Sequence, residues 1–191
     1  MTEDLKYVFK QCRKGDEQSQ RLLFNRMKSV WMGVCVRYIK DRDDAKDVFQ
    51  ESVIKIFKGL KSVEEVDAFE LWARKIIVNT SLNYIKAKQS YLSVINQYEF
   101  TVENSFDKSD EEVLQRMDNE QLLRIIDLIP EGYKIVLNMF LIDGYTHQEI
   151  AMQLNISEST SRSQLSKGKS FLRKLLTQYK FQYEKAVRLR A

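Results

Sequence analysis

The sequence predicts an all-α protein with two helical domains joined by a linker. Its 191 residues include only one proline and six glycines, whereas sandwiches, barrels and doubly wound folds need many Gly- and Pro-dependent turns. Apolar residues recur at helical spacing along most of the chain. The chain is 43% hydrophobic and 30% charged, so it can bury a core, and disorder over its whole length is excluded.

Charge divides the chain into three blocks. Residues 1–90 carry 18 basic residues (Lys/Arg) and 13 acidic residues (Asp/Glu). Residues 91–120 carry 2 basic and 8 acidic residues, and residues 121–191 carry 11 basic and 6 acidic residues. Two basic blocks around an acidic one fit two modules that face nucleic acid, although solvated helix faces would give the same balance. The predicted boundaries are 1–90 for a first domain, 91–109 for an acidic linker, 110–180 for a second domain and 181–191 for a basic tail.

The apolar spacing predicts four helices in the first domain. Asp16 is placed to cap the second helix, and Gly59 ends the third. Residues 61–67 break the pattern and are predicted to form a loop, after which Asp67 is placed to cap the fourth helix. The apolar stretches of the four helices are residues 5–12, 22–38, 45–57 and 69–85.

Helical spacing resumes after the predicted linker. Residues 109–112 have the sequence of a capping box, and apolar residues continue to Ile129. Pro130 suits the first turn of the next helix. That helix is predicted to fill with apolar residues up to Ile142 and to stop at Gly144.

The most specific stretch of the chain is residues 146–165. Thr146 and Glu149 have the spacing of a capping box. Asn155 stands where a left-handed turn residue is needed, and Ser157 is placed to cap the second helix. This is a helix-turn-helix pattern, which places the start of its second helix in the major groove of DNA.

The second helix of this motif presents polar and basic side chains suited to DNA. Arg and Lys can pair with guanine O6 and N7, Ser can donate to bases, and later basic residues suit phosphates. A helical hairpin that binds no DNA is the alternative. The candidate residues for recognition of duplex DNA are Thr160, Arg162, Ser163, Ser166, Lys167 and Lys169.

Two segments of the first domain resemble parts of bacterial sigma factors. Residues 44–52 resemble the helix that binds core RNA polymerase, which follows the pattern D-x-x-Q-E. Asp47, Gln50 and Glu51 match that pattern on one helix face. Residues 69–84 resemble the promoter −10 helix of the same family, which follows roughly F-x-x-W-L-x-x-I-x-x-N.

The second domain completes the resemblance. Residues 130–134 and 144–151 resemble the fourth sigma domain. The three matches occur in the family's order, and the resemblance covers residues 5–88 and 110–176. The chain therefore looks like a sigma-70 factor of the small extracytoplasmic-function (ECF) type, which keeps only the second and fourth sigma domains.

Four residues depart from the family pattern. They affect the −35 sequence that the protein would recognise more than the expected fold. One of them, Gly168, is a glycine inside a helix, which lowers helix stability by about 1 kcal/mol. The departures are Ala73 in place of Leu, Ser159 in place of Gly, Ser161 in place of Val and Gly168 in place of Ala.

The resemblance implies that the protein binds core RNA polymerase and directs promoter-specific initiation. Asp47, Gln50 and Glu51 would contact the coiled coil of the β′ clamp, where carboxylates and amides meet arginines. Acids that only offset the helix dipole are the alternative. The other implied partners are the β flap, promoter DNA and an anti-sigma factor.

For promoter opening, the resemblance implies a pocket for a flipped base beside the loop at about 61–68. Amide side chains suit the Watson–Crick edge of such a base, and basic residues hold the displaced strand without ATP. Trp72 and Tyr84 have a spacing that suits the core as well. The candidate −10 residues are Trp72, Lys75, Asn79, Asn83 and Lys86.

No catalytic residue, metal site or cofactor is predicted. His147 has no further ligands at metal-binding spacing and is expected to be an exposed helix residue or a phosphate contact. Ser163 lacks the base and orienting acid of a nucleophile. Cys12 and Cys35 are isolated, as in reduced cytosolic proteins. No signal peptide or membrane span is visible, so we expect a cytoplasmic protein that does not insert into membranes.

Three other functions remain as alternatives. A helix-turn-helix repressor or activator would not use the residue 44–52 segment. A DNA-processing enzyme would need a catalytic constellation, which the sequence lacks. A pure interaction module would not need the basic recognition helix.

Overall fold

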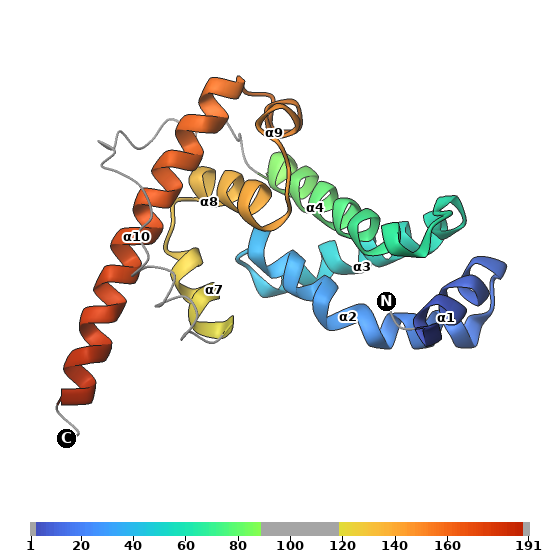
Figure 1. Cartoon of the computed structure of the whole chain (residues 1–191). Helices are drawn as coiled ribbons and strands as arrows, with labels where there is room; N and C mark the ends of the chain where they lie inside the picture. The colour runs from blue at the N-terminus through green and yellow to red at the C-terminus, as the bar shows by residue number, and fades with distance from the viewer. Residues whose placement is uncertain (1–2, 89–118, 189–191) are drawn as a thin grey trace. The chain divides into compact units, whose positions relative to one another are not determined.

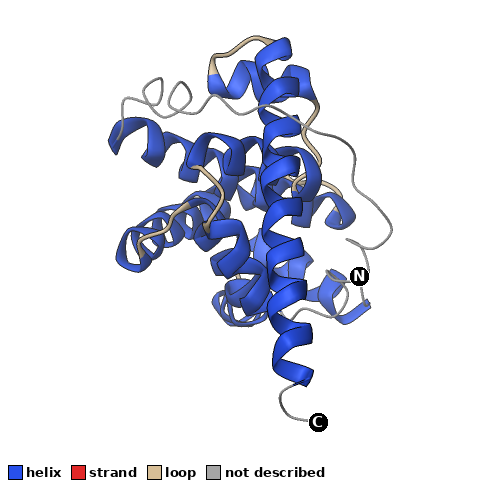
Figure 2. Cartoon of the chain, turned by 90° about the vertical axis from the view of Figure 1, so that its left-hand side faces the viewer, coloured by secondary structure: helices blue, strands red, loops and turns tan. Residues whose placement is uncertain are grey.

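The computed structural model describes residues 3–88 and 119–188. Within these residues every regular element is helical (Figure 2), which confirms the all-α prediction. The chain divides into two compact units, Met1–Ser90 and Tyr91–Ala191. The predicted linker at 91–109 and the predicted capping box at 109–112 lie outside the described residues.

The first unit is built from four long helices, with two short 3₁₀ turns between the third and the fourth (Figure 1). The elements are α1 (Glu3–Lys14), α2 (Glu17–Tyr38), α3 (Arg42–Gly59), η1 (Leu60–Ser62), η2 (Val66–Ala68) and α4 (Phe69–Lys88).

Aspartate side chains cap two of these helices. Asp16 Oδ2 accepts a hydrogen bond from the Ser19 amide at 2.7 Å at the start of α2. Asp41 caps α3 in the same way. The expected cap at Asp67 is wrong: Asp67 lies inside η2, because the segment predicted as a plain loop coils into two 3₁₀ turns before α4.

Aromatic rings join the helices of the first unit at its centre. The Phe9 ring of α1 lies 5.1 Å from the Phe69 ring of α4. The Trp31 ring of α2 lies 6.3 Å from both Phe69 and Phe57. Phe9, Trp31 and Phe69 are at most 2% exposed, so α1 belongs to the same core as the other helices.

The second unit contains the helix-turn-helix segment and the longest described helix, α10. Its elements are α7 (Asn119–Asp127), α8 (Glu131–Leu137), the π-helical η3 (Asn138–Ile142), α9 (His147–Leu154) and α10 (Glu158–Arg188). Pro130 stands at the N-cap of α8, directly before its first turn, and its carbonyl accepts from the Lys134 amide at 2.9 Å. The helix of α10 extends to Arg188, past the boundary at 180 that the sequence predicted for a tail.

The predicted α-helix up to Ile142 instead changes to π-helix at Asn138. The Asp143 amide bonds the Asn138 carbonyl at 3.0 Å, a five-residue step. This wider turn leaves Ile142 39% exposed, so Ile142 is not a core residue as its spacing predicted.

Gly168 allows α10 to pack closely on α8. A Cβ at this position would lie 3.2 Å from the Tyr133 carbonyl oxygen and 3.3 Å from Leu137 Cδ1. Tyr133 and Leu137 belong to a buried cluster with Leu172 and Leu176 of α10. The departure from the family's alanine therefore has a packing reason that the sequence alone did not reveal.

Candidate nucleic-acid and protein interfaces

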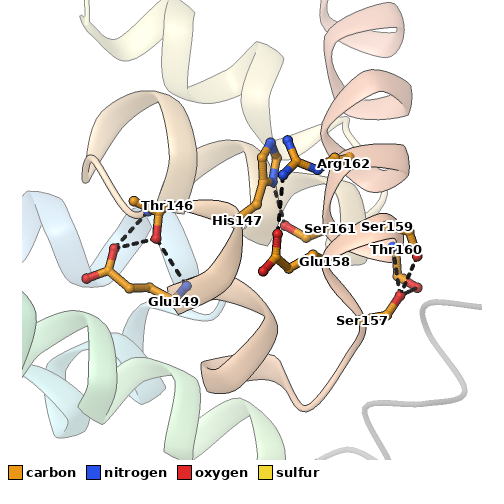
Figure 3. A network of polar contacts seen from close by, with 9 residues as sticks. All are labelled: Thr146, His147, Glu149, Ser157, Glu158, Ser159, Thr160, Ser161 and Arg162. Atoms are coloured by element: carbon orange, nitrogen blue, oxygen red, sulfur yellow. Dashed lines mark hydrogen bonds and ion pairs between the residues drawn. The ribbon is translucent and has the colours of Figure 1, made fainter.

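The first helix of the helix-turn-helix has the predicted cap and turn (Figure 3). Thr146 Oγ1 accepts from the Glu149 amide at 3.2 Å, and the Thr146 amide donates to Glu149 Oε2 at 2.8 Å. Asn155 adopts φ 53°, ψ 48°, the left-handed conformation. The Ile156 amide then bonds the Ala151 carbonyl at 3.0 Å, so the turn into α10 is confirmed.

Ser157 caps α10 through a group of three hydroxyls (Figure 3). Its Oγ accepts from the Thr160 amide at 3.0 Å. The same Oγ lies 2.8 Å from Thr160 Oγ1 and 2.7 Å from Ser159 Oγ. The half-buried Thr160 is therefore engaged in the cap, which reduces what its hydroxyl can offer to DNA.

The remaining candidates on α10 differ in how much of each side chain faces solvent. Arg162, Ser163 and Ser166 are exposed, and the Arg162 guanidinium pairs with Glu158 at 3.2 Å. Lys167 is half-buried, with its Nζ 5.9 Å from the centre of the Tyr133 ring; Lys169 is half-buried too. The exposed surface at the start of α10 thus consists mainly of Arg162, Ser163 and Ser166.

His147 is a packed residue of this motif rather than the exposed one that the sequence predicted. Its Nδ1 lies 2.9 Å from Ser161 Oγ (Figure 3). Its ring stacks on that of Phe140, with 4.5 Å between the ring centres. Burial and the nearby Arg162 charge hold the pKa of His147 below its usual value. Ser161 is fully buried, so the serine in place of the family's Val supplies the polar partner of the single histidine.

The candidate polymerase-binding residues form an exposed face of α3. Asp47, Gln50 and Glu51 are all exposed, whereas Val48 and Ser52 on the other side of the helix are buried. Glu51 Oε1 forms an ion pair with Lys55 Nζ at 2.6 Å. Ile54 adjoins this face four residues after Gln50 and is 54% exposed, although it was not among the predicted contact residues.

The −10 candidates follow one another at helical spacing on α4. Lys75, Asn83 and Lys86 are exposed. Asn79 is half-buried, and its Oδ1 is buried with no hydrogen-bond partner within the described residues. Trp72 is half-buried and its ring lies 6.2 Å from that of Phe69, so part of Trp72 does belong to the core.

An ion pair joins the two candidate helices of the first unit. Lys88 Nζ at the end of α4 lies 2.5 Å from Asp44 Oδ2 at the start of α3. Hydrogen bonds from Lys88 and Tyr84 hold the pKa of Asp44 below its usual value. Tyr84, which the sequence placed in the core, is half-buried and takes part in this contact.

Both units match sequence profiles of one protein family. Residues 23–91 match sigma-70 region 2, and residues 119–172 match sigma-70, region 4. The chain belongs to the sigma-70 family. It is an RNA polymerase sigma factor of the ECF type, and as such a transcription initiation factor and not an enzyme.

Curated relatives and a solved structure agree with this assignment. The chain is 25% identical over 173 residues to an ECF RNA polymerase sigma-E factor of Haemophilus influenzae, covering 86% of this chain and 91% of the relative. It is 26% identical over 170 residues to that of Escherichia coli K12, covering 85% and 88%. The Bartonella quintana sigma factor RpoE, solved with the anti-sigma factor NepR, shares the fold with a TM-score of 0.51 at 13% identity, covering 82% of this chain and 96% of that one.

The described residues hold neither a candidate metal-binding cluster nor a candidate membrane-spanning helix. Over 3–88 and 119–188, no three His, Cys, Asp or Glu side chains are grouped so that they would hold a metal ion. Over the same ranges, no helix combines the length and the apolar character needed to cross a membrane.

Proposed function

We propose that this sigma factor binds core RNA polymerase, recognises −35 DNA as duplex with its second unit, and opens the −10 region with its first. One observation carries this proposal. The match to sigma-70 region 2 falls on the first compact unit, and the match to region 4 falls on the second. Each of these units presents its own polar surface for nucleic acid.

The proposed polymerase contact of the first unit is the exposed face of α3. Asp47, Gln50 and Glu51 offer carboxylate and amide oxygens to arginines of the β′ clamp coiled coil. Ile54 adds apolar area next to them. Such a face gains charge-assisted hydrogen bonds while burying at least one apolar side chain.

The proposed contact of the second unit with the β flap is apolar. Three large hydrophobic side chains of η3 and α9 are exposed although the unit has a well-filled core elsewhere. They are Leu141 at 46%, Ile142 at 39% and Met152 at 78%.

The proposed −10 surface is the α4 face with the turns before it. The side-chain amide of Asn79, whose buried Oδ1 has no hydrogen-bond partner within the described residues, turns outward to accept a hydrogen bond from the Watson–Crick edge of an unstacked base. Asn83 adds a second amide. Lys75 and Lys86 attract the phosphates of the open strand. The binding free energy of the captured strand offsets the cost of unstacking, so no ATP is required.

The proposed −35 surface is the start of α10. Arg162 donates to base edges in the major groove, with Ser163 and Ser166 beside it. Lys167 and Lys169 serve phosphates, and Thr160 holds the cap that orients the helix. Release of Glu158 from Arg162 would accompany DNA binding.

An anti-sigma factor is proposed as a further partner, because the similar Bartonella quintana protein was solved with one. The proposed location is the bacterial cytoplasm, where RNA polymerase meets promoter DNA.

Run-off transcription tests the proposal. The purified chain is added to core RNA polymerase and a promoter library, and specific transcripts are expected. A variant carrying Asp47→Ala, Gln50→Ala and Glu51→Ala should lose transcription through weaker core binding. If no transcript forms while the chain alone binds duplex DNA tightly and specifically, the protein acts as a repressor or activator instead.

A further inference from the structure

A side chain of α1 holds the main chain of the segment between α3 and α4. Arg13 Nη2 donates to the Lys61 carbonyl at 3.3 Å, and Arg13 Nη1 donates to the Glu64 carbonyl at 3.4 Å. A planar guanidinium presents its donors in a fixed fork, so both carbonyls are held in one mutual orientation. Lysine has no equivalent geometry.

Packing fixes the same segment at its buried apolar residues and at the end of α3. Leu60 is 1% and Val63 is 5% exposed. A Cβ at Gly59 would come within 2.9 Å of Trp72 Cζ2, so the main chain at the end of α3 passes directly against the Trp72 ring. The segment is therefore a formed surface held by α1, α3 and α4.

The side chains that this segment presents are polar and exposed. Lys61, Ser62, Glu64 and Glu65 are all exposed to solvent, while the carbonyls of Lys61 and Glu64 accept from Arg13. A loop that is ordered before it binds avoids the entropic cost of ordering at that moment. This arrangement suits capture of an unstacked base by a preformed surface.

We propose that Arg13 is a positioning residue for −10 strand capture. Its fork fixes the Lys61 and Glu64 carbonyls, and thereby the polar side chains of residues 61–65, in the conformation that accepts the flipped base. This inference rests on the −10 role proposed above. Arg13 lies on α1, ahead of the residues 23–91 that match region 2, so the family match gives it no role.

The test compares three variants as holoenzymes with core RNA polymerase. Arg13→Gln removes the fork and the charge, Arg13→Lys keeps the charge alone, and Lys14→Gln removes one charge from the adjacent exposed position. The DNA is a promoter selected from a random library with wild-type holoenzyme, together with single-base substitutions through its −10 region. Opening is followed by the fluorescence of a base analogue in the melted segment.

For Arg13→Gln, we expect the preference for the selected −10 sequence over its substituted forms to fall about three- to tenfold. Arg13→Lys should recover less than half of that loss, and Lys14→Gln should keep the wild-type preference. Core affinity and −35 duplex affinity should not change in any variant.

Three results would overturn the inference: an unchanged base preference in Arg13→Gln, full recovery in Arg13→Lys, or an equal loss in Lys14→Gln. Thermal melting followed by tryptophan fluorescence checks that each variant is folded. If Arg13→Gln does not fold, the base preference measured for Arg13→Lys decides the question instead. If the wild-type holoenzyme itself opens no promoter, the −10 role fails. If it does open one, only the role of Arg13 is at stake.

Discussion

Replacing Gly59 with alanine should destabilise the first unit, whereas the same replacement at Gly33 should stabilise it. Gly59 ends α3 with φ −87°, ψ −4°, a conformation that alanine also adopts. Its new Cβ would stand 2.9 Å from Trp72 Cζ2 and 3.2 Å from Cη2, so the indole has to move. At Gly33, inside α2, a Cβ would meet nothing within 4 Å.

The expected magnitudes follow from these surroundings. A glycine-to-alanine change at a compatible position stabilises by about 0.4–1 kcal/mol through the unfolded chain. Crowding a packed site costs about 1–3 kcal/mol. The free energy of unfolding should therefore rise by up to about 1 kcal/mol in Gly33→Ala and fall by about 1 kcal/mol in Gly59→Ala. For a unit of this size, each 1 kcal/mol shifts the melting temperature by about 4–8 °C.

Tryptophan fluorescence provides a selective assay. The chain has two tryptophans, Trp31 and Trp72, and both lie in the first unit. Thermal melting followed by their emission in the full chain therefore reports on that unit alone. The emission of folded Gly59→Ala should also differ from wild type, because Trp72 is displaced, whereas that of Gly33→Ala should not.

Equal melting temperatures for the two variants would refute the reasoning. So would a stabilised Gly59→Ala with unchanged emission, since the close approach of Gly59 to Trp72 would then have no energetic consequence.

Three predictions concern the second unit. Gly168→Ala should lower its stability and its −35 affinity, because the new Cβ meets the Tyr133 carbonyl, a main-chain atom that cannot rotate away; a stabilised variant would contradict the packing argument. Asn155→Gly should raise the free energy of unfolding by up to about 1 kcal/mol and Asn155→Ala should lower it, because residue 155 has a left-handed conformation. Hydrogen exchange of the α9 and α10 amides measures both free energies, and equal values for the two variants would refute the argument from the left-handed conformation. Burial and the nearby Arg162 charge hold the folded-state pKa of His147 below its usual value of about 6.5. The unfolded chain therefore binds the proton more readily, and the unit should lose stability as pH falls through about 6.5. Urea unfolding followed by circular dichroism at several pH values should show a smaller loss in His147→Gln, and an identical loss would exclude His147 as its source.

Local sequence signals were sufficient where a short range of residues decides the structure. The capping box of Thr146 and Glu149, the left-handed Asn155 and the cap at Asp16 depend on residues within a few positions of one another. The resemblance of residues 44–52 to a polymerase-binding helix singled out Asp47, Gln50 and Glu51, and helical spacing places the three on one face.

Prediction failed where partners come from distant parts of the chain. The lone histidine gave no hint that Phe140 stacks on it and that Ser161 bonds it from the next helix. The spacing of apolar residues through Ile142 predicted a continued α-helix and did not foresee the π-helical turn.

By itself, the sequence determined the all-α class, the helix-turn-helix and the resemblance to ECF sigma factors, because periodicity, capping and motif spacing are properties of neighbouring residues. Only the tertiary structure showed how closely Tyr133 and Leu137 approach Gly168, how closely Trp72 approaches Gly59, and which carbonyls Arg13 holds. Those answers depend on which side chains and main-chain atoms meet across helices, and such distances between remote segments are set by packing, not by local order.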